Sequence, residues 1–184
     1  MLKSLFLLFS LIIFSILSFV EAKASSICSP SHIEIALKHF SYCQPSEQAN
    51  KVSFQTFTND TYSVVINDNS SELSLSWITG ATALAGLPNK YDLTPLEFMT
   101  RAFNGTFDIQ SEDMQKVSAE LGVIDEANVF TATHGAKHIF SSIRPSGVQT
   151  AYILQPNSDW LLRLDGKFDI NTLMYVVDKL TLMR

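Results

Sequence analysis

Four histidines and two cysteines are the residues of this chain best suited to chemistry. His134 and His138 are four residues apart, a spacing that on a helix would place both imidazoles on one face and suit a metal ion. Gly135 and the β-forming residues around it instead predict a turn that enters a strand. We therefore expect a candidate polar site with one surface and one partly exposed histidine, and no metal. His32 and His39 are expected on the solvated face of a helix.

The motifs of nucleophilic and phosphate-binding enzymes are missing from the sequence. It contains no Gly-x-Ser-x-Gly, no Cys-x-x-Cys and no Gly-Lys-Ser/Thr motif. Neighbouring carboxylates occur at Glu112-Asp113 and Asp125-Glu126, and the first pair suits the N-terminus of a helix. These observations favour a protein without catalytic activity and without a cofactor. A small secreted hydrolase whose site includes His134 or His138 stays open as an alternative.

Two features of the chain suit an oxidising compartment outside the cytoplasm. Cys28 and Cys43 are its only cysteines, and a lone pair of this kind usually forms a disulfide there. Two buried free thiols are the alternative. Three Asn-x-Ser/Thr sequons, at Asn59, Asn69 and Asn104, would accept N-linked glycans in a eukaryotic secretory route.

The N-terminus predicts export. Lys3 precedes an uncharged apolar run from Ser4 to Val20, and Ala22 and Ala24 follow it as the small residues that a signal peptidase requires. We expect residues 1–24 to be a signal peptide and residues 25–184 to form one periplasmic or extracellular domain. A retained membrane anchor is the alternative, whereas a cleaved chain would have no membrane span. The formal net charge of −5 argues against nucleic acid as a partner.

The hydrophobic patterns predict the elements that position these residues. Ile33, Ala36, Leu37 and Phe40 follow helical spacing, so a helix is expected over residues 29–42. Thr94, Pro95 and Glu97 predict a capped helix start. The further helices are expected at 112–121 and from 169 onward, and the strands at 52–55, 62–67, 73–78, 129–133, 137–144, 148–154 and 160–164.

Residues 80–91 are rich in small side chains and predict a surface loop. Loops on a rigid sheet often contact partners, so this loop is the expected binding edge. Its candidate contact residues are Thr82, Leu84, Leu87, Asn89, Lys90 and Tyr91. Trp77 and Trp160 lie in expected strands, and both are predicted to pack in the core.

The order of these elements predicts an α+β fold, with helices packed on an antiparallel sheet. The last third of the chain carries the segments HGAKHIF (134–140), QTAYIL (149–154) and DWLLRL (159–164), followed by a helix that ends VDKL. This order of short strands and a final helix resembles the closing pattern of the Mog1/PsbP-like group, which includes small DcrB-type proteins. The resemblance implies a non-enzymatic accessory, inhibitor or assembly-factor role and carries over no site residues.

Together these patterns predict a small exported binding protein without catalytic activity. Its expected partner is another protein or a component of the cell envelope, and an inhibitor or immunity role is one form of this hypothesis. The hydrolase named above is one alternative. The other is a carrier that holds a small apolar ligand between sheet and helices, which would need an apolar cavity.

Overall fold

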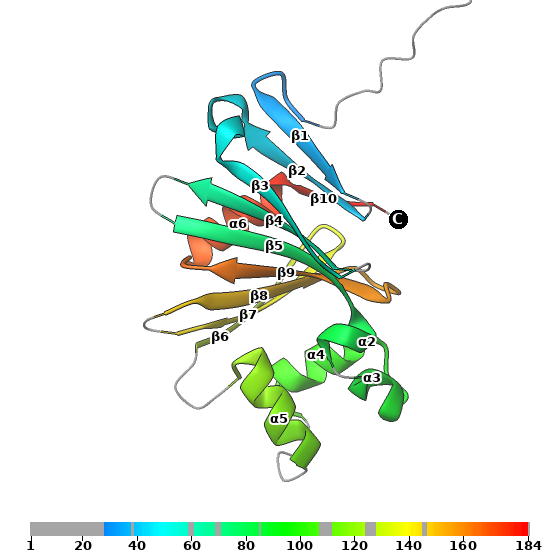
Figure 1. Ribbon diagram of the computed structural model, residues 1–184. Coiled ribbons are helices and arrows are strands. Elements are labelled where there is room, and N and C mark those ends of the chain that lie inside the picture. Colours follow the sequence, from blue (N-terminus) through cyan, green and yellow to red (C-terminus); the bar gives the residue numbers. More distant parts are fainter. Residues whose placement is uncertain are drawn as a thin grey trace, which may run out of the picture.

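The computed structural model describes residues 28–37, 39–58, 61–68, 71–84, 86–106, 112–123, 128–144 and 147–183. The predicted signal peptide and the sequons at Asn59 and Asn69 lie outside these residues. The chain folds into two antiparallel sheets with a few helices (Figure 1), so the predicted α+β class is confirmed.

The larger sheet contains all of the predicted strands. Its strand order is β3-β4-β5-β9-β8-β7-β6, and every neighbouring pair is antiparallel. Buried Leu73, Leu75 and Trp77 alternate along β5 with less buried serines, as the sequence predicts. The strands are β3 (Val52–Thr58), β4 (Thr61–Asp68), β5 (Ser71–Thr79), β6 (Asn128–His134), β7 (Lys137–Ile143), β8 (Gln149–Leu154) and β9 (Trp160–Gly166).

The predicted helix over residues 29–42 is wrong, because this segment forms a hairpin of β1 (His32–Leu37) and β2 (Phe40–Pro45). The disulfide between Cys28 and Cys43 is confirmed, with their Cα atoms 5.5 Å apart. A helix between the cysteines would separate them by about 20 Å at 1.5 Å per residue, so the helix and the disulfide exclude each other.

A short strand that the sequence analysis missed completes the smaller sheet. The last helix ends at Lys179, and Leu180, predicted as part of its apolar face, instead begins β10 (Leu180–Leu182). β10 pairs with β2, so the smaller sheet has the order β1-β2-β10. A single 3-10 segment, η1 (Ser46–Lys51), leads from this sheet to β3.

The predicted loop over residues 80–91 is also wrong in part, because it contains two short helices. They are α2 (Gly80–Ala83) and α3 (Leu87–Lys90). The Thr79 side chain caps α2 by accepting a hydrogen bond from the backbone N–H of Thr82, and Gly86 adopts a left-handed φ of 72° between the helices.

The longer helices form where the sequence predicts them. They are α4 (Pro95–Phe103), α5 (Glu112–Leu121) and α6 (Ile170–Lys179). Glu112 and Asp113 occupy the first turn of α5, as expected from the favourable interaction of carboxylates with a helix N-terminus. Asp169 caps α6 by accepting a hydrogen bond from the backbone N–H of Thr172 at 2.8 Å. No helix within the described part of the chain is long and apolar enough to cross a membrane.

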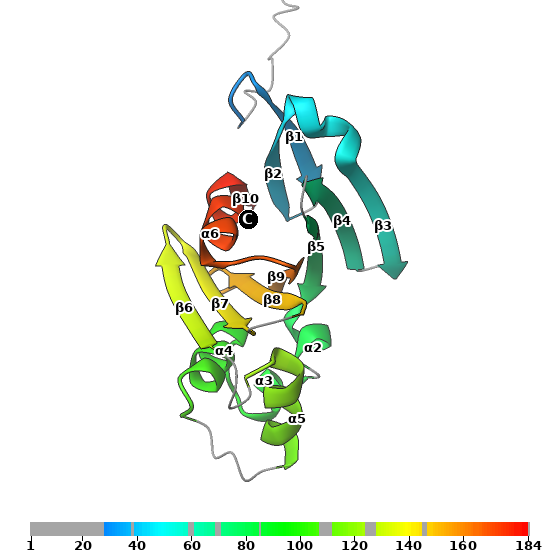
Figure 2. The ribbon, with the colours of Figure 1, turned by 90° about the vertical axis from the view of Figure 1, so that its left-hand side faces the viewer.

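Two hydrophobic clusters occupy opposite faces of the larger sheet. Figures 1 and 2 show α2–α5 grouped together, away from α6. Side chains of β7 alternate between the clusters, since Ile139 belongs to the one that contains α6, whereas Phe140 packs on Phe103 of α4 with ring centroids 5.3 Å apart. The cluster around α6 also includes Phe40 and Tyr42, and it therefore joins the smaller sheet to the larger one.

An aromatic cluster adds a second link between the sheets. His39, in the turn between β1 and β2, stacks on Trp77 with ring centroids 4.5 Å apart and lies 5.2 Å from the Trp160 ring. His39 is therefore half-buried, which corrects its expected place on a solvated helix face. Trp77 is buried, as predicted, and Trp160 is half-buried.

Candidate functional site

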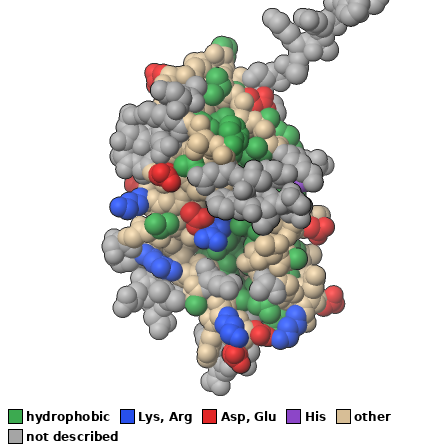
Figure 3. All heavy atoms as spheres, viewed as in Figure 1, with side chains coloured by type: hydrophobic (Ala, Val, Ile, Leu, Met, Phe, Trp, Pro, Cys, Tyr) green, Lys and Arg blue, Asp and Glu red, His purple; other side chains and the backbone are tan. Residues whose placement is uncertain are grey.

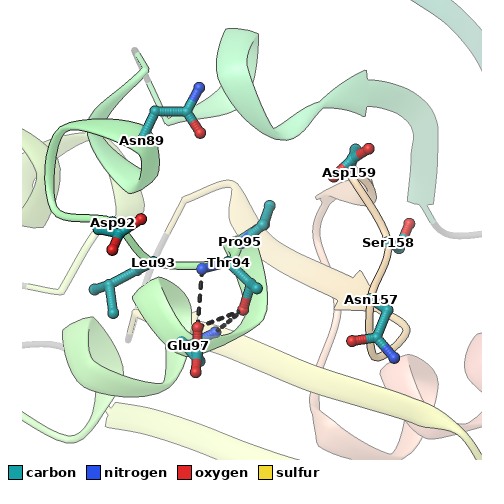
Figure 4. A pocket seen from close by; sticks show the side chains of 9 residues that line it. All are labelled: Asn89, Asp92, Leu93, Thr94, Pro95, Glu97, Asn157, Ser158 and Asp159. Atoms are coloured by element: carbon teal, nitrogen blue, oxygen red, sulfur yellow. Dashed lines mark hydrogen bonds between the residues drawn. The ribbon is translucent and has the colours of Figure 1, made fainter.

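A polar groove of about 630 Å³ lies between the segment that connects α3 to α4 and the turn that connects β8 to β9 (Figure 4). The two walls come from parts of the chain that are far apart in sequence. One wall consists of Asn89, Asp92, Leu93, Thr94, Pro95 and Glu97, and the other of Asn157, Ser158 and Asp159.

Two further hollows share lining residues with this one. One, of about 460 Å³, shares Asn89, Pro95 and Asp159 with the groove and reaches Thr79. The other, of about 530 Å³, shares the β8–β9 turn and reaches Trp160 and Met183. The three hollows share lining residues, and we call them together the groove.

Both walls contain a residue other than glycine with a left-handed backbone. The φ angle is 53° at Asp92 and 59° at Asn157. Aspartate and asparagine adopt this conformation more readily than other side chains, and such residues are often found in turns and ligand sites. The turns therefore have defined backbone shapes, and Figure 4 shows the two side chains on opposite walls.

A capping box orders the side chains at the start of α4. The Glu97 carboxylate accepts hydrogen bonds from the backbone N–H and the Oγ1 hydroxyl of Thr94, both at 2.9 Å. In return, Thr94 Oγ1 accepts a hydrogen bond from the backbone N–H of Glu97 at 3.2 Å. The hydrogen bond from the Thr94 backbone is the main reason that the pKa of Glu97 is lowered. Glu97 is therefore ionised and held in place at neutral pH.

Gly80 allows the two walls to approach each other. Its N–H donates to the carbonyl oxygen of Asp159 at 2.7 Å, which ties the β8–β9 turn to the start of α2. A Cβ atom at position 80 would lie 2.7 Å from Cγ of Pro95 and 3.2 Å from the Asp159 carbonyl oxygen. A larger residue would force these segments apart, so this close contact needs glycine.

The groove is acidic. Asp92, Glu97 and Asp159 line it, and no lysine, arginine or histidine is among the described residues of its walls. Lys90, next to the groove, forms an ion pair with Asp113 of α5 and donates a hydrogen bond to its carboxylate. This hydrogen bond raises the pKa of Lys90. The groove therefore presents hydrogen-bonding groups and negative charge to a ligand.

The structure brings only part of the predicted binding edge to this site. Asn89 lines the groove, and Lys90 and Tyr91 are exposed beside it. Leu84 is only 1% exposed and cannot contact a partner, since it packs in the cluster of α4 and α5. Of the other two predicted contact residues, Thr82 is exposed, and Leu87 is partly buried against that cluster.

The residues of the opposite wall were not predicted as part of the site. Residues 156–159 read Pro-Asn-Ser-Asp and were expected to separate two strands, which they do. Turn-forming residues give no signal for which distant segment will lie across from them. Only the antiparallel order of the sheet and the docking of α4 bring the two walls together.

The structure places the two histidines of the predicted polar site on opposite faces of a hairpin. His134 pairs with Lys137, and His138 pairs with Thr133, so the two imidazoles point to opposite sides of the β6–β7 hairpin. As predicted, one is exposed and the other partly buried. His134 Nε2 lies 3.7 Å from Asp178 Oδ1 of α6, outside the groove. No group of three potential metal ligands comes together in the described ranges of the chain.

A serine–histidine contact occurs elsewhere, in the turn before β1. Ser29 Oγ lies 2.6 Å and Ser31 Oγ 3.1 Å from Nδ1 of His32, next to a small hollow of about 190 Å³ that Asp178 also lines. His32 was expected on a helix but begins a strand. Both serines are exposed and contact the same ring nitrogen. The contact is therefore accounted for by the local turn.

No protein-family model matches this chain, and a search of curated proteins finds none similar to it. The resemblance of the last third to the Mog1/PsbP-like group stays a prediction. Glycosylation of Asn104 also stays a prediction, although the structure places this residue on the surface at the end of α4.

Proposed function

We propose that the chain is an exported, non-catalytic binding protein that holds a basic, extended segment of another protein in its groove. The observation that carries this proposal is the composition of the groove, in which three carboxylates occur with no basic residue among the described lining residues. Carboxylates at an open surface attract lysine and arginine side chains and favour them over acidic ones.

The shape and chemistry of the groove support a polypeptide as the ligand. Its three neighbouring hollows are open to solvent rather than closed pockets for a small molecule. Side-chain amides of Asn89 and Asn157 can pair with backbone N–H and C=O groups of a ligand. Exposed Tyr91 lies next to this groove and offers an aromatic surface.

The disulfide between Cys28 and Cys43 supports export, because such bonds persist in oxidising compartments. The predicted signal peptide supports the same location. In that setting, an inhibitor, immunity or envelope accessory role suits an acidic binding groove, and the Mog1/PsbP-like resemblance implies roles of the same kind.

The rival functions have less support. A hydrolase that uses His134 or His138 would need them in a concave site, whereas the groove contains neither. A carrier of a small apolar ligand would need an apolar cavity between the sheet and a helix. The facing side chains of Leu173, Val177 and Ile153 are instead fully buried in one hydrophobic cluster.

The experiment is calorimetric titration of residues 25–184 with three octapeptides that alternate serine with lysine, glutamine or glutamate. We expect the lysine peptide to bind most tightly and its affinity to fall as salt is added. Replacing Asp92 and Asp159 together by asparagine should weaken this binding about tenfold, since each surface ion pair contributes up to about 1 kcal/mol.

Asp178→Asn is the matched control, because it removes an exposed carboxylate on α6 that does not line the groove. This control should bind the lysine peptide as the parent does. Equal affinity for all three peptides would contradict the proposal. Equal weakening by the control and the groove variant would place the binding site elsewhere.

A further inference from the structure

The strand β6 forms a free edge of the larger sheet. It is the last strand in the order β3-β4-β5-β9-β8-β7-β6 and, within the described part of the chain, pairs only with β7. Its register is regular from Asn128 opposite Ile143 to His134 opposite Lys137. Figure 2 shows β6 at the outer margin of the sheet. One side of its backbone therefore has no strand neighbour among the described residues.

Edge strands are normally protected against pairing with another chain by charged residues, prolines, bulges or short length. The other described edges of this molecule have such protection. β3 has an irregular register between Thr56 and Thr58, β1 carries the exposed Glu34, and β10 is only three residues long. β6 has seven residues, NVFTATH, without a bulge, a proline, an acidic residue, a lysine or an arginine.

We propose that β6 pairs with β6 of a second copy of the chain, antiparallel about a two-fold axis at Thr131. This register makes the strand self-complementary. Each pair then combines a larger with a smaller side chain, two β-branched side chains or two polar ones. The pairs are Thr131 with Thr131, Phe130 with Ala132, Val129 with Thr133, and Asn128 with His134.

Charge and exposure favour a second copy as the occupant. The chain has a formal net charge of −5, so two copies repel each other over most of their surfaces. β6 avoids this repulsion because it carries no acidic side chain. Val129 is 42% exposed, and Thr131 and Thr133 are also exposed, so pairing removes apolar surface from water while joining the two sheets.

Sedimentation equilibrium of residues 25–184 tests this proposal. We expect a reversible dimer at micromolar concentration. Thr131→Lys places two ammonium groups opposite each other at the axis and should raise the dimer dissociation constant at least tenfold. Phe54→Lys is the control, since Phe54 is an exposed residue on the other edge strand, β3, and its replacement should leave the dimer intact.

A cross-linking experiment tests directly whether β6 forms the dimer interface. Thr131→Cys should give a covalent dimer with a short bismaleimide, because directly opposed residues have Cβ atoms about 5 Å apart. Phe54→Cys should not. A chain that stays monomeric at 100-fold higher concentration would overturn the proposal, as would a dimer that both lysine variants weaken equally or equal cross-linking at both positions.

Discussion

The ammonium group of Lys137 links the larger sheet to the end of a helix. It extends from β7 and donates hydrogen bonds to the carbonyl oxygens of Val177 at 2.5 Å and Leu180 at 2.6 Å. These carbonyls lie where α6 ends and β10 begins, and a cation near a helix C-terminus is favourable. Partial burial lowers the pKa of Lys137, although nearby Asp178 acts in the opposite direction.

Lys137→Met should therefore lower the free energy of unfolding by about 1–2 kcal/mol, because it leaves two carbonyl groups without their charged donor. Urea unfolding measures this loss. Lys167→Met, at an exposed position after β9, is the control and should change stability by less than about 0.5 kcal/mol. If both variants lost the same stability, the hydrogen bonds to α6 would not be the cause.

At the scale of single residues, the sequence was informative about covalent and capping contacts. The Cys28–Cys43 bond and the cap at Thr94 depend on residue type and local spacing, and both were predicted correctly. The role of Lys137 was not predicted, because its hydrogen-bond partners lie 40 and 43 residues further along the chain.

At the scale of the elements, two helix starts depend on ionised carboxylates. Glu97 and Asp169 each accept hydrogen bonds from backbone N–H groups, and these bonds lower the pKa of both side chains. A carboxyl group whose pKa is lower in the folded chain binds fewer protons there than in the unfolded chain. Its stabilising effect is therefore complete above the ordinary carboxyl pKa and is lost as pH falls through the lowered value.

Glu97→Gln and Asp169→Asn should consequently be less stable than the parent at neutral pH, and the difference should shrink as the solution is acidified. Urea unfolding at a series of pH values measures this convergence. Glu72→Gln, on an exposed position of β5, provides the comparison. A constant difference between the cap variants and the parent across the acid range would argue against this origin.

The predicted helix over residues 29–42 shows the limit of pattern analysis for short segments. Ile33, Ala36, Leu37 and Phe40 fit helical spacing, but Ile33, Ile35 and Leu37 also fit the alternation of a strand. The longer patterns of α4, α5 and α6 have local caps or acidic first turns and were predicted correctly. In the hairpin, tertiary pairing and the disulfide decided between two periods that the residues satisfy equally well.

At the scale of the whole molecule, the predicted export and the disulfide are linked, because such a bond persists in an oxidising compartment. Closing a loop between cysteines 15 residues apart contributes about 3 kcal/mol by restricting the unfolded chain. We expect protein recovered from the medium or the periplasm to begin at Ser25 and to resist alkylation at Cys28 and Cys43. Edman sequencing and mass spectrometry test both statements. Intact precursor in the cytosol with reduced thiols would contradict them.

The candidate site also belongs to this scale, which explains why, of the described residues that line its two walls, only Asn89 was anticipated. Asn89 was predicted as a contact residue because its segment is rich in small side chains and was expected to form a surface loop. Asn157 and Asp159 were not, since their position across the groove depends on the pairing of β8 with β9 and on the Gly80 contact. A site assembled from distant turns leaves little local signal in a sequence.

The aromatic cluster has a practical consequence for optical experiments. The chain has two tryptophans, and both lie around His39 at the junction of the two sheets, with ring centroids 6.5 Å apart. Intrinsic tryptophan fluorescence therefore reports on that junction, whereas α4 and α5 contain no tryptophan. Separation of the N-terminal hairpin would change the signal at once, but loosening of α5 alone would pass without a spectral change and would need circular dichroism or hydrogen exchange to be seen.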